Sequence, residues 1–365
     1  MPAEPDVLII GAGVVGLSIA YHLNQRGASV TVLDRAGIGA GASGVQPGGL
    51  RQQWGTRVNC TLARESMDFY TDVRERLQMR VDPGFRACGY LFLAHSEDVL
   101  GRLRENVRLQ NSLGVSSSIV TPTEIAELVP GLDVATVVGG AWSADDGYFD
   151  GPQSIVEAFG ALADVRLGDV RAVGDDGVVT LQSGDQLEPG ATVIVTGVDT
   201  PRLLPELPIR AEARYLFFSD PIAERLLEPL VISAELRFAA KQLADGRLLA
   251  SDLGAHGRPE TDSEDWRATL REAREALLPR LVYVALPQLV EGLYDVTPDH
   301  QAILGRVRDR VWVAAGFSGH GFMHAPAVGR IFAEAVLEGR EDEALGILDP
   351  GRFAEGRLVP EPQVV

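Results

Sequence analysis

The segment DVLIIGAGVVGLSIAYHLNQRGASVTVLDR, near the start of the chain, constrains the fold more than any other part of the sequence. Residues 7–10 are four apolar residues of the kind that form a buried parallel strand. A glycine-rich turn follows them, and the pattern then predicts a helix over residues 14–26. A second predicted strand, residues 28–33, ends at Asp34 and completes a βαβ unit.

Three glycines in GxGxxG spacing join the first strand to the helix, and each has a physical task. Gly11 makes the tight turn, Gly13 lets a pyrophosphate approach the backbone, and Gly16 lets the helix pack closely on the strand. The helix N-terminus offers free N–H groups and a partial positive charge to phosphates. Asp34 can accept hydrogen bonds from ribose hydroxyls. Because these parts fall in register, the unit predicts dinucleotide binding rather than a tight turn without a ligand.

Two further glycine-rich segments favour FAD over NAD as the dinucleotide. Residues 36–55, AGIGAGASGVQPGGLRQQWG, are irregular, and their small residues allow the backbone to approach a bulky ligand. Arg51 brings a permanent cation to that place. Residues 311–336, VWVAAGFSGHGFMHAPAVGRIFAEAV, predict a strand at 311–314, a glycine turn and a helix from about Phe322. An NAD-dependent dehydrogenase would normally continue its alternating βαβ units instead.

Four blocks of this sequence together resemble the D-amino-acid-oxidase (DAO) superfamily of flavoproteins. They are the first βαβ unit, GASG…GGLRQQWG, GLYDVTPDHQAILG and AAGFSGHGFMHAPAVG. The blocks occur in the expected order along the whole chain, whereas residues 95–290 match loosely. Within the superfamily, the chain is most similar to the sarcosine oxidase β-subunit, glycine oxidase and the β-subunits of opine and proline dehydrogenases. The resemblance implies an FAD-dependent amine or amino-acid oxidase or dehydrogenase.

The resemblance also implies which residues bind the cofactor. In this family the strand–glycine–helix unit near residue 316 returns to the first domain and closes over the flavin. Its N–H groups and the positive end of its helix would stabilise negative charge on the reduced flavin and raise the reduction potential. The predicted cofactor-binding residues are Gly11, Gly13, Val14, Val15, Gly16, Asp34, Arg35, Ala42, Ser43, Arg51, Gln52, Gln53, Val170, Gly197, Gly316, Phe317, Ser318, Gly319, His320, Gly321, Phe322 and Met323.

The family oxidises an amine next to a carboxylate by hydride transfer to flavin N5, and the resulting imine hydrolyses. Arg51 aligns with the arginine that binds the substrate carboxylate in monomeric sarcosine oxidase, a role that suits a bidentate guanidinium. A structural ion pair or contact with the flavin alone are the other interpretations of Arg51. Tyr294 lies on a strand expected to face the pocket, and Tyr215 is a weaker candidate that more simply packs in the sheet. His320 completes the predicted catalytic set, either as a flavin contact or as an acid–base group.

The sequence departs from monomeric sarcosine oxidase at three places. Met323 replaces a lysine that helps to bind carboxylate in that relative. Gly292 stands where its cysteine tethers the flavin, so we expect non-covalent FAD. The strand that matches its oxygen-activating lysine, GRLLASD, has no lysine, and Lys241 lies one strand earlier. These departures weaken the sarcosine and oxidase assignments and favour considering a dehydrogenase, whose electrons pass to a quinone or a partner protein rather than to O2.

Patterns along the rest of the chain predict further helices and a second sheet. Residues 60–79 have apolar side chains at helical spacing, and residues 96–114 form another predicted helix. Short alternating strands between residues 210 and 305 predict an antiparallel sheet, interrupted by a helix at 263–278. The Pro-rich segment after Arg357 is predicted to fray.

We therefore expect an α/β (α+β) fold with two discontinuous domains. The first is a Rossmann-like FAD-binding domain of glutathione-reductase type, formed by residues 1–86, 148–208 and 300–365. The second is an antiparallel-sheet substrate domain, formed by residues 87–147 and 209–299.

Composition excludes several other kinds of function. A net charge of −18 argues against a nucleic-acid partner and against binding to an acidic membrane surface. No stretch approaches the roughly 18 consecutive apolar residues of a membrane span, and the acidic N-terminal segment does not resemble a signal peptide. We therefore expect a cytoplasmic protein. Cys60 and Cys88 are predicted free thiols, and the six histidines show no metal-binding spacing.

Three other functions stay open at this stage. A flavin monooxygenase shares the N-terminal fold, but it needs NAD(P)H and a second flavin motif, where this chain has GFSGHGF. An FAD-dependent 2-hydroxy-acid dehydrogenase needs similar geometry and a base, which His320 could supply. A flavin-bound subunit of a multi-subunit dehydrogenase is the third, and the presence of Arg51 argues against it. The favoured substrate is a small amino acid or secondary amine of the sarcosine, glycine, proline or opine kind.

Overall fold

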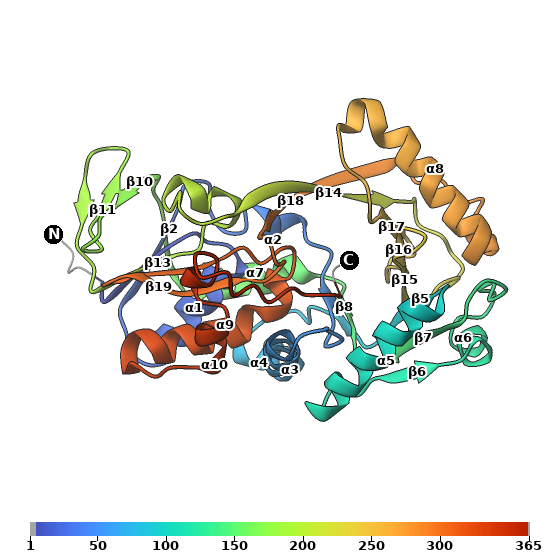
Figure 1. Cartoon of the computed structure of the whole chain (residues 1–365). Helices are drawn as coiled ribbons and strands as arrows, with labels where there is room; N and C mark the ends of the chain where they lie inside the picture. Colours follow the sequence, from blue (N-terminus) through green and yellow to red (C-terminus); the bar gives the residue numbers. More distant parts are fainter. Residues whose placement is uncertain (1–4, 364–365) are drawn as a thin grey trace.

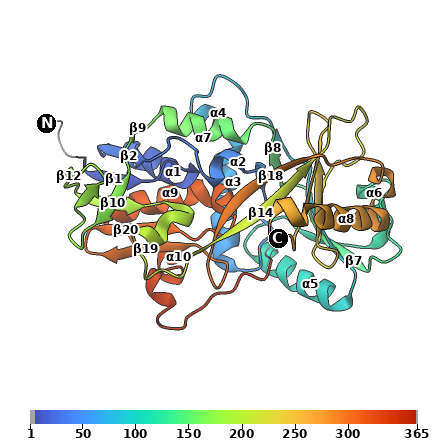
Figure 2. The same ribbon diagram turned by 90° about the horizontal axis from the view of Figure 1, so that it is seen from above.

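The structure is a computed structural model, and it describes residues 5–363. Figure 1 shows two halves, one built around a six-stranded sheet and the other around an eight-stranded sheet. Strands β14 (Arg210–Phe218) and β18 (Gln288–Val296) pair along their whole length. In both Figure 1 and Figure 2 this long ribbon runs from one half to the other.

The six-stranded sheet has the order β19–β20–β13–β1–β2–β9. Neighbouring strands are parallel, except that the edge strand β19 runs antiparallel to β20. This sheet confirms the predicted Rossmann-like fold. Its strands are β1 (Val7–Ile10), β2 (Val30–Asp34), β9 (Asp164–Leu167), β13 (Ala191–Ile194), β19 (Ile303–Arg308) and β20 (Val311–Ala315).

Both faces of this sheet are covered, which explains why β1 and β20 are apolar at every position. In β1, Val7 and Ile9 pack with the helices, whereas Leu8 and Ile10 pack with the small sheet on the other face. The covering helices are α1 (Val14–Asn24), α3 (Arg57–Thr71), α7 (Pro152–Ala161) and α9 (Gly321–Glu338). The small sheet consists of β10 (Val170–Val173), β11 (Val179–Leu181) and β12 (Gln186–Leu187).

The eight-stranded sheet has the order β18–β14–β17–β16–β15–β5–β7–β6. It is antiparallel, as the alternating sequence pattern predicted, apart from one parallel pair. That pair is β15 with β5. Helix α8 (Pro259–Leu277) packs on one face, and α5 (Glu97–Ser112) packs on the other. The strands not yet given are β5 (Tyr90–Ala94), β6 (Ser118–Val120), β7 (Gly139–Ser143), β15 (Leu230–Ser233), β16 (Phe238–Gln242) and β17 (Leu248–Asp252).

The remaining elements are short. A fourth sheet has β8 between β3 and β4, so it joins segments that are distant in sequence. The two large sheets draw their strands from the two sets of ranges assigned above to the two domains, whose limits stay a prediction. The short elements are α2 (Ala42–Val45), β3 (Gly49–Leu50), α4 (Val73–Arg76), β4 (Phe85–Arg86), α6 (Pro122–Leu128), β8 (Gly147–Phe149) and α10 (Glu343–Ile347), and the 3-10 turns Gly197–Arg202, Pro279–Leu281 and Pro350–Arg352.

Two local predictions need correction. The predicted helix at residues 60–79 begins earlier, at Arg57, and it breaks at Asp72 into α3 and α4. Residues 358–363, the described part of the segment after Arg357, do not fray. They lie against the rest of the chain, because the buried Glu361 carboxylate accepts hydrogen bonds from residues at the start of α3.

Candidate active site

The first glycine turn places the start of α1 against the ends of β1 and β13. Gly11 has a φ of +117°, and a side chain there would overlap the backbone just after β13, so only glycine fits. The space beside Gly13 is open except for the Ser43 hydroxyl. The N–H groups of Gly13, Val15 and Gly16 have no acceptor within the described part of the chain. Donors at a helix N-terminus suit the phosphates of a dinucleotide.

Asp34 ends β2 beside this turn, as predicted, and its carboxylate is already engaged by the backbone. Oδ2 accepts from the N–H of Ala12 at 2.8 Å. Oδ1 accepts from the N–H groups of Ala36 and Gly37, at 2.8 and 2.9 Å. Asp34 therefore fixes the glycine turn at Ala12 and the turn after β2. A carboxylate offers about four lone-pair sites, so these three bonds leave room for one ribose hydroxyl.

Other predicted cofactor residues surround the same turn. Ser43, in α2, accepts a hydrogen bond from the N–H of the first residue of α1 at 3.0 Å. Arg35 forms an ion pair with Asp199 over 2.6 Å, which brings it to the 3-10 turn that starts at Gly197. Val170 begins β10 and is buried against the six-stranded sheet. The structure therefore gathers these residues at one edge of that sheet.

The second glycine turn, residues 316–320, joins β20 to α9, and Asp295 holds it in shape. The N–H of Gly316 donates to Asp295 Oδ2 at 2.7 Å, and the N–H of Ser318 donates to the Asp295 carbonyl at 3.1 Å. Burial raises the pKa of the Asp295 carboxyl to about 6, against the opposing effect of these backbone hydrogen bonds. The predictions did not include Asp295, although it lies next to Tyr294 in the GLYDVTPDH block.

Arg51 is a deeply buried cation of the site. Its side chain is 2% exposed, and its guanidinium carbon lies 3.8 Å from the centre of the Trp54 ring. Nη2 donates to the Gln363 carbonyl at 2.7 Å, and Nη1 donates weakly to the Gln53 carbonyl at 3.4 Å. Nε has no partner, and no carboxylate within residues 5–363 pairs with Arg51. Burial therefore lowers the pKa of Arg51, with Glu361 the charged group that opposes this most.

Two histidines lie against the Trp54 ring, on which Arg51 also stacks. The imidazoles of His320 and His324 lie 4.3 and 5.2 Å from the Trp54 ring, between centroids. Burial, reinforced by the Arg51 charge, lowers the pKa of His324 to about 3 and that of His320 well below its ordinary value. Neither Nε2 has a partner within the described residues. A neutral His320 can accept a hydrogen bond, but it holds a proton poorly.

Tyrosine side chains form another part of the same site. The Tyr294 ring lies against Gly319, where an added side chain would overlap it. Tyr90, at the start of β5, is buried, and its hydroxyl would overlap a side chain placed on Gly49. Both tyrosines lie close enough to the Arg51 charge for it to oppose the burial that raises their pKa values. Sequence reasoning missed Tyr90 because a tyrosine in the strand YLFLA is ordinary for a sheet.

Tyr215 is not part of this site. Its ring stacks on Trp266 at 4.3 Å between centroids, and its hydroxyl donates to the Gly257 carbonyl at 3.0 Å. Both contacts lie on the face of the eight-stranded sheet that α8 covers. Tyr215 therefore has the packing role that was its simpler interpretation.

Gln52 and Gln53, both predicted to bind the cofactor, are held by Asp146. The carboxylate accepts from the N–H of Gln52 at 2.8 Å and from Nε2 of Gln53 at 3.1 Å. Burial raises the pKa of Asp146 to about 7, although these hydrogen bonds oppose the shift. Asp146 was not predicted either, since it lies in an acidic turn that resembles an ordinary exposed loop.

Lys241 links the eight-stranded sheet to the predicted flavin loop. Its Nζ donates to the Pro47 carbonyl at 2.8 Å and lies 4.0 Å from the centre of the Tyr148 ring. Lys241 is paired directly with Leu249 across β16 and β17, so both side chains project from the same face. Burial lowers the pKa of Lys241 to about 7.

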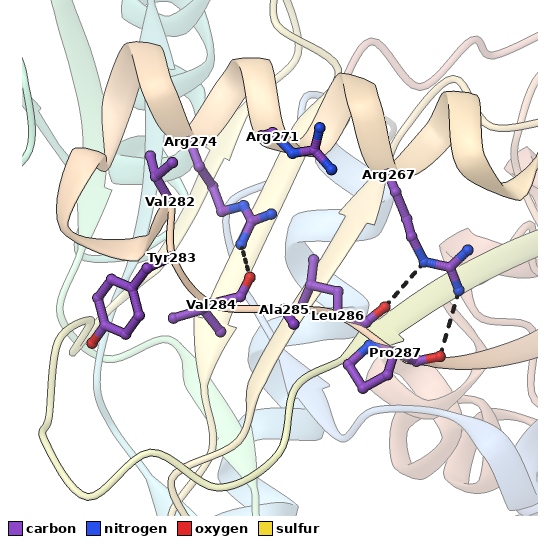
Figure 3. A pocket seen from close by; sticks show the side chains of 9 residues that line it. All are labelled: Arg267, Arg271, Arg274, Val282, Tyr283, Val284, Ala285, Leu286 and Pro287. Atoms are coloured by element: carbon purple, nitrogen blue, oxygen red, sulfur yellow. Dashed lines mark hydrogen bonds between the residues drawn. The ribbon is translucent and has the colours of Figure 1, made fainter.

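A separate pocket lies on the outer side of α8 and does not include the predicted site residues. It encloses about 350 Å³ between α8 and residues 282–287, and Figure 3 shows three arginines of α8 facing that segment. Arg267 donates to the Leu286 carbonyl at 3.1 Å, and Arg274 donates to the Val284 carbonyl at 2.6 Å. These arginines fasten the loop to the helix.

The residues around the two glycine turns fit FAD. The open space beside Gly13 and the unpaired N–H groups of α1 would bind its pyrophosphate, and the 316–320 turn would lie against the flavin ring. Within the described residues, no group of three potential ligands could hold a metal ion. None of the helices in that part of the chain is long and apolar enough to span a membrane.

Similar proteins support the same interpretation. The chain is 27% identical to FAD-dependent oxidoreductase domain-containing protein 1 of Xenopus laevis, over 93% of this chain and 80% of that protein. It is 24% identical to 4-methylaminobutanoate oxidase (formaldehyde-forming) of Paenarthrobacter nicotinovorans, over 97% of this chain and 46% of that protein.

Solved structures share the fold over nearly the whole chain. L-proline dehydrogenase from P. horikoshii superposes with a TM-score of 0.89 and 27% identity, covering 98% of this chain and 100% of that one. Glycine oxidase from Geobacillus kaustophilus has a TM-score of 0.83 at 23% identity, covering 96% and 99%. The profile of the family described as "DAO: FAD dependent oxidoreductase" matches residues 6–335. The chain therefore belongs to the DAO family of FAD-dependent oxidoreductases.

Proposed function

We propose that this enzyme oxidises a small amino acid or secondary amine that carries a carboxylate, and that Arg51 binds the carboxylate. Bound FAD would accept a hydride at N5 from the carbon next to the amine nitrogen, leaving an imine that water hydrolyses. The observation that carries the proposal is Arg51 itself, a buried guanidinium whose Nε has no partner and which pairs with no carboxylate within residues 5–363. Burying a cation without a counter-ion is costly, and a bidentate substrate carboxylate would supply one.

The surroundings of Arg51 fix how a substrate would be bound. Trp54 stacks on the guanidinium and sets its plane. The hydroxyls of Tyr90 and Tyr294 add neutral donors to the same site. We infer that both stay protonated, because burial raises both pKa values. A carboxylate would therefore meet one cation and two O–H donors.

Acid–base catalysis by His320 is not part of this proposal, because its lowered pKa makes it a poor proton carrier. A substrate amine would instead have to bind in its neutral form. The rate of substrate oxidation at low substrate concentration would then rise with pH towards the pKa of the free amine.

The similar proteins are consistent with this substrate class. The names L-proline dehydrogenase, 4-methylaminobutanoate oxidase and glycine oxidase each specify an amine that also carries a carboxylate. We propose non-covalent FAD, because Gly292 offers no side chain to a tether and burial raises the thiol pKa values of Cys60 and Cys88. Acid precipitation should release the yellow colour into the supernatant, and colour retained by the pellet would contradict this.

The first test is the visible spectrum of the purified holoenzyme under anaerobic conditions, during titration with amino acids, N-methyl and cyclic amino acids, and 2-hydroxy acids. Bleaching by an amino acid or secondary amine is the expected result. Bleaching only by a 2-hydroxy acid would assign the enzyme to the alternative class, a 2-hydroxy-acid dehydrogenase. Admitting air afterwards distinguishes an oxidase, which recolours rapidly, from a dehydrogenase that needs another acceptor.

Arg51→Met tests the carboxylate site within the same titration. It should raise the apparent Kd of the bleaching compound by about 100-fold, since a charged hydrogen-bonded pair is worth about 3 kcal/mol. Arg57→Met is the matched control, because Arg57 is the exposed first residue of α3. An unchanged Kd in Arg51→Met would reject Arg51 as the carboxylate ligand.

A further inference from the structure

Glu361 fastens the segment Val359–Gln363 to the start of α3. Its side chain belongs to a residue that is 4% exposed. One carboxylate oxygen accepts from the N–H groups of Gly55 at 2.7 Å and of Gln363 at 2.9 Å. The other accepts from the Thr56 hydroxyl at 2.7 Å and from Nδ2 of Asn59 at 2.9 Å. The Glu361 carboxylate therefore accepts four hydrogen bonds, which hold it in one position.

The Glu361 carboxylate provides the negative charge that the N-terminus of α3 otherwise lacks. Thr56 is the N-cap of the helix, but its side chain makes no capping hydrogen bond, and the first turn contains no acidic residue. A carboxylate is stabilising at a helix N-terminus, where N–H groups lack partners and the helix dipole is positive. Glu361 supplies that charge from a distant part of the sequence.

The same segment reaches the predicted carboxylate-binding residue. The Gln363 carbonyl accepts from Arg51 Nη2 at 2.7 Å. Asn106, from α5, holds the Gln363 side chain through a hydrogen bond to Oε1. The Pro362 ring packs against Gly55, where a side chain would overlap it. Gln363 is thus held on two sides, because Asn106 binds its side chain and Glu361 accepts from its N–H.

A carbonyl is a suitable partner for an arginine that must bind an anion. A carboxylate in contact would neutralise the guanidinium and occupy two of its donors. The Gln363 carbonyl takes one N–H and leaves the net charge, the other Nη hydrogens and Nε–H available. The acid that provides the anchoring, Glu361, binds α3 rather than Arg51.

We propose that Glu361 is a positioning residue for substrate binding: it holds the Gln363 carbonyl against Arg51 and so fixes the guanidinium for a substrate carboxylate. This inference rests on the proposed function, in which Arg51 is the carboxylate ligand. Glu361 touches neither substrate nor flavin in this arrangement. Its effect is expected on carboxylate affinity rather than on the rate of the chemical step.

The test compares Glu361→Ala and Glu361→Gln with Glu355→Gln, as FAD-loaded full-length proteins. Glu355 is exposed and, among the described residues, its carboxylate forms an ion pair with Arg357 alone, so it is the matched control. Acetate, a carboxylate without an amine, is titrated while the absorbance of bound FAD is recorded. Hydrogen exchange of the Gly55 amide reports on the anchor independently of any reaction.

Glu361→Ala should lose protection of the Gly55 amide and weaken acetate binding at least tenfold. Glu361→Gln should lie between it and the wild type, because an amide oxygen can still accept from Gly55 but its NH2 group cannot accept from Asn59. With a bleaching substrate, the apparent Kd should rise while the limiting rate of bleaching changes less than threefold. Glu355→Gln should match the wild type throughout.

Lost protection with unchanged acetate affinity would overturn the positioning role and leave Glu361 as a helix cap alone. An equal loss in affinity and limiting rate would also overturn it, in favour of general disruption. Acetate binding that is insensitive to Arg51→Met, or absent in the wild type, would reject the proposed function of Arg51 itself. Acetate binding lost in Arg51→Met but kept in Glu361→Ala would reject only the inference about Glu361.

Discussion

The hydroxyl of Tyr70 donates a hydrogen bond of 2.6 Å to the carbonyl of Phe322, in the first turn of α9. Within a helix this carbonyl would accept from the N–H of residue 326, but that residue is Pro326, which has none. A second side chain of α3 also bonds to the backbone of α9: the Ser66 hydroxyl accepts from the N–H of Ala327 at 3.2 Å. Side chains of α3 therefore complete the backbone hydrogen bonding of the helix that follows the second glycine turn.

Tyr70→Phe should lower the free energy of unfolding by about 1–3 kcal/mol, the cost of leaving a buried carbonyl without a donor. In a Pro326→Ala background the new N–H can reach the same carbonyl, so the cost of Tyr70→Phe should fall by at least half. Urea unfolding of the four proteins of this double-mutant cycle measures the coupling. Equal costs in both backgrounds would show that the Tyr70 hydroxyl does not replace the N–H that Pro326 lacks.

Gly319 and Gly339 form a matched pair for testing the second glycine turn. Both have positive φ, +91° and +63°, but a side chain at Gly319 would overlap the Tyr294 ring, whereas nothing lies within 4 Å at Gly339. Gly339→Ala should cost only about 1–2 kcal/mol of backbone strain and leave FAD affinity unchanged. Gly319→Ala should also weaken FAD binding at least tenfold, as measured by equilibrium dialysis. Similar FAD affinity in both variants would contradict a role for this turn at the flavin.

Tyr294→Phe removes a hydroxyl and keeps the ring that packs on Gly319. If Tyr294 binds the substrate carboxylate, the apparent Kd of the bleaching compound should rise at least about tenfold, because a hydrogen bond to a charged group is worth about 1.5–3 kcal/mol. Tyr215→Phe is the control, since the Tyr215 hydroxyl bonds to Gly257 beneath α8. A rise of the same size in both variants would indicate a general loss of stability rather than a lost substrate contact.

The sequence predicted correctly those helices and strands whose conformation depends mainly on neighbouring residues. Strand β1 matches residues 7–10 as predicted, and the helix predicted at residues 96–114 forms as α5, Glu97–Ser112. Periodicity alone placed the end of α3 wrongly, because the break at Asp72 leaves no mark in the apolar spacing of residues 60–79. Local sequence thus predicted the elements better than their limits.

The site residues that could not be predicted depend on contacts between distant segments. Tyr90, Asp146 and Glu361 have ordinary local surroundings in the sequence, and their roles arise only when β5, the turn after β7 and the end of the chain meet near Arg51. Glu361 lies in a Pro-rich stretch whose composition favours fraying, yet four hydrogen bonds fix its carboxylate. A composition-based prediction cannot include donors contributed from some 300 positions away in the sequence.

Because Lys241 is buried, we expect the free energy of unfolding to depend on pH in a specific way. The pKa of Lys241 is lowered by burial to about 7 in the folded protein, whereas a lysine in an unfolded chain titrates near 10.4. Between these values the unfolded chain binds more protons, so the free energy of unfolding rises with pH. Below pH 7 both states carry the proton, and this contribution is constant.

Lys241→Met should remove that rise. The difference in unfolding free energy between wild type and Lys241→Met should therefore shift in favour of the wild type by about 2 kcal/mol from pH 7 to pH 9, at about 1.4 kcal/mol per pH unit once the titration is under way. Urea titrations at each pH measure it. The comparison must be a difference, because the raised thiol pKa of Cys60, which Lys241 does not influence, lowers stability at alkaline pH in both proteins alike. Parallel curves would show that the hydrogen bond to Pro47 and the Tyr148 ring are enough to keep the Lys241 ammonium charged in the folded protein.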